Sequence, residues 1–321
     1  MITVYKFLKT GVKTGSLSDL GNTVKCWAHC VKPSDADLKA LSDKTKIPLS
    51  DFREALDPDE RPKTYDLDNY SVIIVRAPWT KEDGIETTPI AIFISKKKNN
   101  VITFVIREIK SVRSFKEGIE SNRFNVYERG MSYFTYRLLD ETFNRYFAIM
   151  DFIEEKIDKI EDRVIERPDK VTAQDIFSMK KTLIFFHKAL TTNRDVVTSI
   201  EKEYISQIDK KNIKRFRTLY NDVTQLIDMV GTQRDIMTGT LDLYVSSVSK
   251  NLNETIKTLT VIASFVLIPT LIASIYGMNF DTSSPWNMPE LAWEYGYMFS
   301  LALMGASMVI IYIYFRKKGW M

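Results

Sequence analysis

The sequence predicts an α+β membrane protein, with a cytosolic N-terminal α/β domain, a long helical stalk and two C-terminal transmembrane helices. Three observations support this fold class. Of the 321 residues 27% are charged, yet no Lys or Arg stands between Lys257 and Arg316. Two apolar segments in that interval have about 20 residues each, the length that a helix needs to cross ~30 Å of hydrocarbon. The residues before 257 mix short β-branched segments with long helical patterns.

Residues 1–125 are expected to form an α/β domain around a sheet. Segments rich in β-branched and aromatic residues predict strands at Thr23–Cys30, Tyr70–Ala77, Thr88–Ser95 and Val101–Arg107. Helices are expected to begin at Ser34, which suits an N-cap, and at Ser50. No glycine-rich phosphate loop is present, and His29 and His187 do not fit a specific catalytic set. We therefore expect neither enzyme activity nor an organic cofactor.

Charge and cysteine content argue against several other classes. The net charge is only +4, and no basic field marks nucleic acid as a partner. Cys26 and Cys30, the only cysteines, are with His29 too few for a four-ligand zinc site. We interpret them as reduced thiols, partly buried in a strand. The segment Met1–Gly15 has lysines but no apolar core, which argues against a cleaved signal peptide.

The pattern is helical over residues 126–257. Helices are expected over Met131–Arg167, before Pro168, over Thr172–Ile205 with Thr172 as N-cap, and from about Asp209 onward. The third meets no proline before Pro269 and continues into the first apolar span, so we interpret it as a stalk. A 4-3 spacing along it predicts a coiled-coil-like seam of Leu219, Val223, Leu226, Val230, Gln233 and Met237.

The expected spans cover residues 258–276 and 295–315, with aromatic residues at their ends. A helical hairpin buried in a soluble protein is the alternative, but it needs no interval free of basic residues. The loop 277–294 has no Lys or Arg, whereas the tail 316–321 and the residues before the first span are basic. The positive-inside rule therefore predicts a multi-pass protein of the cell (inner or plasma) membrane, with both termini in the cytosol.

One face of the first span is narrow, mostly small and uncharged. Steps of three and four residues meet Asn253, Ile256, Thr260, Ala263, Leu267, Thr270, Ser274 and Gly277. Such a polar stripe is typical of tight helix packing or of the wall of a water-filled path, and the spacing leaves both open. Two spans cannot enclose a lumen, so a pore requires a ring of subunits.

Two motifs stand at the outer end of this span. The span ends in Tyr276-Gly-Met-Asn-Phe280, and the loop contains Met288-Pro-Glu-Leu291. With the basic tail and the stalk, they resemble the CorA family of magnesium channels, whose signature is Gly-Met-Asn after the first of two C-terminal spans. The resemblance covers the architecture of the whole chain and is strongest from Arg234 to Trp320. It implies a funnel-shaped homopentamer in the lipid bilayer, with the first span lining a central pore.

The resemblance also implies roles for single residues. Gly277, Met278 and Asn279 would form the outer mouth, where a ring of Asn279 amides meets hydrated Mg²⁺. Ser274 departs from the family, in which glycine is common at that position. The implied pore lining, with the polar stripe, comprises Asn253, Ile256, Leu259, Thr260, Leu267, Thr270 and Ser274.

The absence of acids between Glu254 and Asp281 fits passage of a hydrated divalent ion. Mg²⁺ gives up water reluctantly, and neutral oxygens can bind its first-shell waters without removing them. A proton-coupled carrier instead needs an intramembrane ionisable group. We expect Mg²⁺ influx, with Co²⁺ or Ni²⁺ as further ions, driven by the membrane potential and gated by cytosolic Mg²⁺. The alternatives are a zinc transporter of the same architecture, which Met278 disfavours, and a membrane-tethered signalling or scaffold protein.

Acids gather on one face of the first long helix. Asp151, Glu155, Asp158 and Asp162 recur there at 4-3-4 spacing, and Asp222 lies on the stalk. They are candidates for a regulatory metal patch that binds divalent ions between cytosolic domains. The alternative is an ordinary solvent-exposed helix face that binds no metal, because Lys159 and its basic neighbours are placed for helical ion pairs. Thr218 stands where the family has an acid, with Asp222 one turn later.

Overall fold

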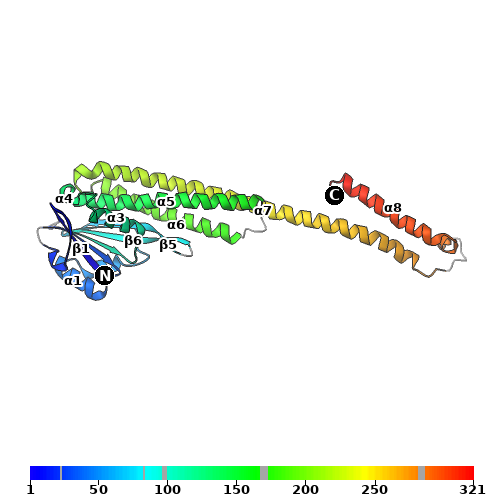
Figure 1. Ribbon diagram of the computed structural model, residues 1–321, viewed down its shortest axis with the longest axis horizontal. Coiled ribbons are helices and arrows are strands. Elements are labelled where there is room, and N and C mark those ends of the chain that lie inside the picture. Colours follow the sequence, from blue (N-terminus) through cyan, green and yellow to red (C-terminus); the bar gives the residue numbers. More distant parts are fainter. Residues whose placement is uncertain (22–23, 82–83, 96–99, 167–172, 281–285) are drawn as a thin grey trace. The chain divides into compact units, whose positions relative to one another are not determined.

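The computed structural model describes the chain except residues 22–23, 82–83, 96–99, 167–172 and 281–285. It divides into two compact units, Met1–Leu241 and Asp242–Met321 (Figure 1). The helix α7 (Ile213–Tyr276) contributes residues to both units. The expected domain boundaries at residues 125 and 257 follow changes in sequence character and stay a prediction.

A mixed sheet forms the centre of the first unit. Its seven described strands have the order β2-β1-β3-β7-β6-β5-β4. The pairing of β3 with β7 is parallel, and the other pairings are antiparallel. The four predicted strands correspond to β3, β5, β6 and β7. The bounds are β1 Ile2–Leu8, β2 Gly11–Gly15, β3 Lys25–Val31, β4 Lys63–Asp66, β5 Tyr70–Lys81, β6 Gly84–Ser95 and β7 Asn100–Val105.

Three of the described strands, β1, β2 and β4, were not predicted from the sequence. In β1, Val4, Tyr5 and Phe7 are buried, although lysines stand nearby in the sequence. Strands β2 and β4 form the two edges of the sheet and have no buried residue. A strand that buries so little has too few apolar residues to show a period-2 pattern.

Helices cover both faces of the sheet (Figure 1). On one face, Phe52 of α2 contacts Phe93 and Phe104 of the sheet. On the other face, Trp27 of β3 contacts Phe115 of α3 and Phe134 of α5. The bounds are α1 Asp35–Thr45, α2 Leu49–Glu54, α3 Lys110–Glu120, α4 Val126–Arg129, α5 Met131–Glu166 and α6 Ala173–Glu201.

Local capping explains where several helices begin and end. The Ser34 hydroxyl accepts a hydrogen bond from the Asp37 N–H, and Asp37 accepts one from the Ser34 N–H, so the predicted N-cap of α1 is confirmed. Helix α2 begins at Leu49, one residue before Ser50. Helix α6 ends at Glu201, before the predicted Ile205, because Glu203 adopts a left-handed φ of 62°. Thr172 and Pro168 lie outside the described residues.

The stalk helix α7 begins at Ile213, after a 3₁₀ turn over Lys210–Asn212. Its predicted seam is confirmed as a buried face within one chain, since all six seam residues are at most 7% exposed. Near the start of α7, Phe216 contacts Tyr136 of α5 at 6.1 Å between ring centroids. The seam therefore attaches α7 to the other helices of the first unit.

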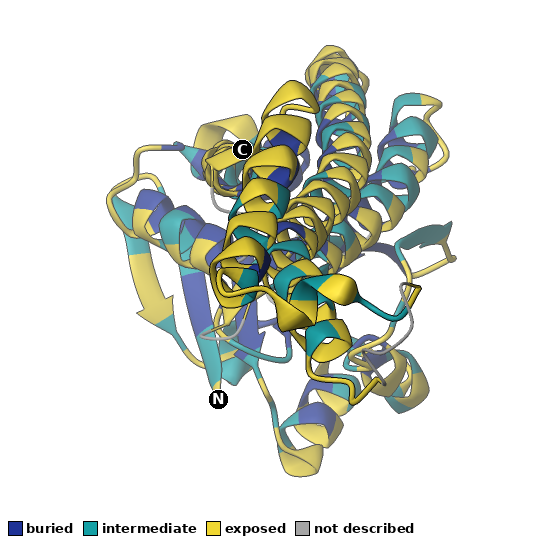
Figure 2. Cartoon of the chain, turned by 90° about the vertical axis from the view of Figure 1, so that its right-hand side faces the viewer, coloured by how far each residue is buried: buried dark blue, intermediate teal, exposed yellow. Residues whose placement is uncertain are grey.

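The second unit contains two apolar helices, the C-terminal part of α7 and α8 (Gly296–Lys317). Both are long and apolar enough to cross a membrane, and only 6% and 17% of their most apolar windows are buried. A hairpin in the core of a soluble protein would be largely buried, so this exposure favours lipid-facing spans (exposed residues are yellow in Figure 2).

Candidate functional site

One face of α7 packs against α8 in the second unit. Val261 of α7 forms a buried cluster with Ile311 and Phe315 of α8, and Phe265 packs against it. Tyr276 is partly covered and continues the same face of α7, since the steps from Val261 are close to whole helical turns. This face is the one through which the two spans hold together.

The polar stripe lies on the opposite side of α7. With about 100° of rotation per residue, its centre is about 180° from the face that carries Val261 and Phe265. Helix α8 therefore leaves the stripe uncovered in a single chain. Leu259, the further residue of the implied pore lining, is exposed beside the stripe. All eight residues of the stripe are exposed: Asn253, Ile256, Thr260, Ala263, Leu267, Thr270, Ser274 and Gly277.

The threonines of the stripe present acceptors. The Thr260 hydroxyl donates to the Ile256 carbonyl oxygen and the Thr270 hydroxyl to that of Val266, both at 2.7 Å. Each hydroxyl thus uses its proton on its own helix and keeps its oxygen lone pairs for an outside donor. The first-shell waters of a cation are hydrogen-bond donors. The stripe therefore presents hydrogen-bond acceptors to the waters of a hydrated cation.

The large apolar side chains of the stripe, and Leu259 beside it, are also exposed. Ile256 is 51% exposed, and Leu259 and Leu267 are each 65% exposed. Large side chains left open to this degree on one face of a helix need a covering surface or a narrow path. The stripe thus alternates short apolar stretches with acceptors.

The predicted outer mouth begins where α7 ends. The Gly277 N–H donates to the Ala273 carbonyl oxygen at 2.9 Å, and the Met278 N–H donates to that of Ile275 at 3.2 Å. These bonds satisfy two of the last four carbonyl groups of the helix. Asn279 follows beyond the last turn and is exposed. The Gly-Met-Asn segment is therefore a helix terminus with an exposed amide at its tip.

The loop motif lies against this terminus. The Tyr276 hydroxyl donates to Glu290 Oε1 at 3.1 Å, which joins the Met-Pro-Glu-Leu segment to the end of the span. A Cβ at Gly296 would be 2.4 Å from the Glu290 carbonyl oxygen, so the loop requires a glycine there. Both motifs could be named from the sequence, but the contact of Tyr276 with Glu290 that connects them, and the role of Gly296, could not.

The four acids of α5 are exposed. Glu155 accepts a hydrogen bond from Lys159, and this contact lowers the pKa of Glu155. Over the described part of one chain, no group of three or more His, Cys, Asp or Glu is placed to hold a metal ion. The metal patch of Asp151, Glu155, Asp158 and Asp162 therefore stays a prediction that needs ligands from a second copy.

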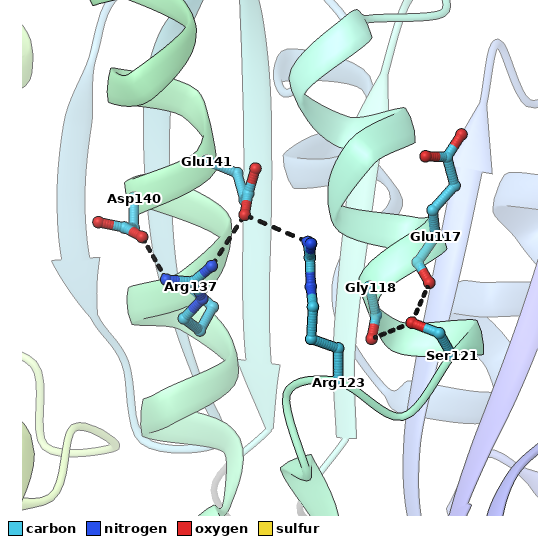
Figure 3. Close-up of polar contacts among 7 residues, drawn as sticks. All are labelled: Glu117, Gly118, Ser121, Arg123, Arg137, Asp140 and Glu141. Carbon is cyan, nitrogen blue, oxygen red and sulfur yellow. Dashed lines mark hydrogen bonds and ion pairs between the residues drawn. The ribbon is translucent and has the colours of Figure 1, made fainter.

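Asp222 has a different environment. It is half-buried, and burial, together with the charge of Asp140 on α5, raises the pKa of Asp222. Burial also raises the pKa of Asp140, although Arg137 opposes the shift. Figure 3 shows Arg137 between Asp140 and Glu141. Sequence reasoning missed Asp140, because its approach to Asp222 is a tertiary contact that no local spacing encodes.

The thiols and His29 are core groups. Cys26 and Cys30 are free and fully buried rather than partly buried. His29 Nδ1 lies 3.0 Å from the Thr103 hydroxyl oxygen, and burial lowers the pKa of His29 to about 4. The imidazole is therefore neutral at physiological pH and belongs to the packing of the sheet.

Comparison with known proteins identifies the family. Residues 23–317 match the CorA-like Mg²⁺ transporter protein family. The chain belongs to this family. A Methanocaldococcus jannaschii protein named cobalt/magnesium transport protein CorA is 32% identical over 295 residues, 92% of this chain and 90% of the relative. A Thermotoga maritima protein of the same name is 35% identical over 273 residues, 84% and 76% of the two chains.

Solved structures agree with the fold. The complete CorA magnesium transporter from Methanocaldococcus jannaschii matches with a TM-score of 0.86 at 28% identity, covering 100% of this chain and 99% of that one. The ZntB cytoplasmic domain from Vibrio parahaemolyticus matches 78% of this chain and 98% of its own with a TM-score of 0.60. At 13% identity this second likeness shows the fold alone, so it does not favour zinc transport. The chain is a membrane transporter and not an enzyme.

Proposed function

We propose that this chain forms an ion channel that admits hydrated Mg²⁺ to the cytosol, with Co²⁺ and Ni²⁺ as further ions. The observation that carries the proposal is the exposed stripe of α7, which faces away from α8 and ends at Asn279. Relatives at 32% and 35% identity are named cobalt/magnesium transport proteins, which supports these ions over Zn²⁺. A tether for a scaffold protein has no need of such a stripe.

The channel is a ring of subunits around the stripes. Among the described residues, one chain offers two helices long and apolar enough to cross a membrane. One face of α7 is already occupied by α8, so a lumen requires several copies of α7. The resemblance of the Gly-Met-Asn region to CorA channels makes five the expected number. Mass measurement in mild detergent should give a pentamer as the main species, and a monomer or dimer would contradict the ring.

Both termini lie in the cytosol in this proposal, and the loop with Asn279 faces outward. Arg316, Lys317 and Lys318 follow α8, whereas the loop from 277 to 294 has no basic residue. Inward movement of a divalent cation is then driven by the membrane potential, which supplies about 4.6 kcal/mol per 100 mV for two charges.

Asn279 is the first selective contact. Its amide oxygen accepts a hydrogen bond from a first-shell water, and the ring repeats that contact around the axis. Each bond is worth only about 1 kcal/mol net, but several together distinguish an ordered octahedral hydration shell from a loose one. The ion therefore enters without losing its waters.

The test is Mg²⁺ influx into vesicles that contain the purified protein, read by a fluorescent indicator. Wild type should conduct Mg²⁺, and Asn279→Ala should lose most of the influx while it assembles normally. Asn251→Ala is the matched control, because Asn251 is exposed on α7 but lies off the stripe. Wild-type influx through a correctly assembled Asn279→Ala protein would place selection elsewhere.

We further propose that cytosolic Mg²⁺ closes the channel by binding carboxylates of neighbouring first units. Asp222 and Asp140 are the best candidates, because each is half-buried and has a raised pKa. A bound cation would stabilise their ionised carboxylates. The exposed acids of α5 are the second candidates. Millimolar Mg²⁺ should slow proteolysis of the wild type but not of Asp222→Asn. Digestion at equal rates with Mg²⁺ and with a chelator would refute this regulation.

A further inference from the structure

A cavity of about 370 Å³ lies in the first unit, between α6 and the β5–β6 part of the sheet. Its lining includes three basic side chains, Arg76, Arg61 and Lys188, and the aromatic ring of Phe185. Cavities of this size are typical of sites for small ligands. Neither the ion pathway nor the acids of α5 use these residues.

Arg76 is fixed in place by its main chain. The side-chain amide of Asn193 accepts from the Arg76 N–H at 2.9 Å and donates to its carbonyl oxygen at 2.8 Å. The Tyr146 hydroxyl donates to the same carbonyl oxygen at 2.9 Å. Asn193 and Tyr146 are both fully buried, so two polar groups of α5 and α6 serve to position one strand residue.

The guanidinium of Arg76 has neutral partners. Its Nε donates to the Thr87 hydroxyl at 2.9 Å, and its Nη atoms donate to the carbonyl oxygens of Thr87, Glu60 and Pro58 at 2.6, 2.9 and 3.1 Å. No carboxylate of the described residues forms an ion pair with it. Burial accordingly lowers the pKa of Arg76. Asp59 and Asp57 act on the charge of Arg76 and Arg107 opposes them. One N–H, and a charge that no ion pair among the described residues neutralises, are left for a ligand.

The other charges around the cavity leave a basic balance. Glu60 is engaged by Lys63 at 3.2 Å, and Asp59 is the remaining acid of the lining. Lys188 and Arg61 are exposed, and in the described part of the chain neither side chain has an ion-pair partner. Within the lining, three cations therefore face one carboxylate, Asp59, that has no ion pair among the described residues.

Phe185 adds an apolar surface to this basic site. The ring is 48% exposed and lies one helical turn before Lys188 on α6, so both side chains border the same opening. A ligand that satisfies both needs an anionic group and a flat or apolar part. Guanidinium and ammonium groups together are typical of phosphate recognition.

We propose that this cavity binds a small phosphorylated anion of nucleotide size, with the phosphate at Arg76, Lys188 and Arg61 and the remainder against Phe185. The site would let the cytosolic unit respond to an anion that itself binds divalent cations. The proposal stands independently of the ion pathway, because it rests on residues of the first unit alone.

The test is isothermal titration of the full-length protein in detergent with sodium ADP and with sodium phosphate, in buffer free of Mg²⁺. Lys188→Gln should weaken ADP binding about tenfold, through the loss of one charge-assisted contact. Lys202→Gln is the matched control, since Lys202 is exposed and lies ~21 Å further along the chain at helical rise. Its affinity should equal that of wild type.

Phe185→Ala separates the two parts of the ligand. It should weaken ADP binding and leave phosphate binding unchanged, because only the nucleoside contacts the ring. Arg76 is left intact in these variants, since its side chain holds the fold around the cavity. Absence of binding at millimolar ADP would overturn the proposal. So would equal affinities of wild type and Lys188→Gln, or an equal loss in Lys202→Gln.

Discussion

Replacement of Thr270 by Val tests whether the stripe of α7 carries water-bound ions. The two side chains have nearly the same shape, and the hydroxyl of Thr270 donates only to its own helix, at the Val266 carbonyl oxygen. Thr270→Val therefore removes one acceptor per subunit with little change in helix packing. A helix stripe that serves only for packing should tolerate this change.

The expected magnitude follows from how many hydrogen bonds the hydrated ion makes with the ring of Thr270 hydroxyls. A hydrogen bond from a first-shell water to a hydroxyl is worth about 1 kcal/mol net. A hydrated ion with about six waters can bind two or three subunits of a ring at one level. The barrier in Thr270→Val should therefore rise by about 2–3 kcal/mol, or roughly 30- to 160-fold in flux.

The assay is the initial rate of Mg²⁺ influx into vesicles at a fixed membrane potential. Thr258→Val is the matched control, because its hydroxyl makes the same kind of bond, to the Glu254 carbonyl oxygen at 2.9 Å. Thr258 lies on the other side of α7 from the stripe, so this variant should conduct like wild type. Thr270→Ser keeps the acceptor and should retain most of the flux. Influx through Thr270→Val within twofold of wild type would refute the reasoning.

Three further predictions concern the stability of the two units, measured by thermal unfolding. Asn193→Ala should lower the free energy of unfolding by about 2–4 kcal/mol, because it leaves the buried N–H of Arg76 without its hydrogen-bond acceptor. Asp222→Asn should stabilise the protein at neutral pH. Burial and Asp140 raise the pKa of Asp222 in the folded state. Wild type is therefore fully stable only below the unfolded-state pKa of 3.8, where the carboxyl is protonated. It loses stability as the pH rises through the folded-state pKa and the buried carboxyl ionises. The gain over wild type should vanish in acid. Gly296→Ala should lower the free energy of unfolding by about 1–3 kcal/mol, because the added Cβ would overpack against the Glu290 carbonyl oxygen.

Local sequence patterns were sufficient to predict the parts of the fold in which one type of residue recurs at a regular spacing. The stalk seam and the polar stripe both lie on α7, and both could be predicted because each holds a constant spacing over several turns. The central strands β5, β6 and β7 have long β-branched runs. The edge strands β2 and β4 have none. They form by pairing with β1 and β5, and their own residues do not predict that pairing.

The interactions that matter for the sites of the first unit are long-range. Asn193 and Arg76 are 117 residues apart, and Asp222 meets Asp140 of another helix. Such pairs form because packing brings two faces together, so one sequence contains no spacing that predicts them. The motif at the end of α7 is different. Its residues are nearly contiguous, and the sequence therefore supplied both the Gly-Met-Asn segment and the loop motif.

The central claim is that the stripe of α7 lines a water-filled path, and substituted-cysteine accessibility tests it most directly. Cys26 and Cys30 are fully buried, so the wild-type background should be low. A positively charged, membrane-impermeant thiol reagent should react with Ser274→Cys and block Mg²⁺ influx. Ile262→Cys, exposed on another side of α7, should neither react nor lose influx. Unimpaired influx through treated Ser274→Cys, or an equal block of Ile262→Cys, would contradict the account.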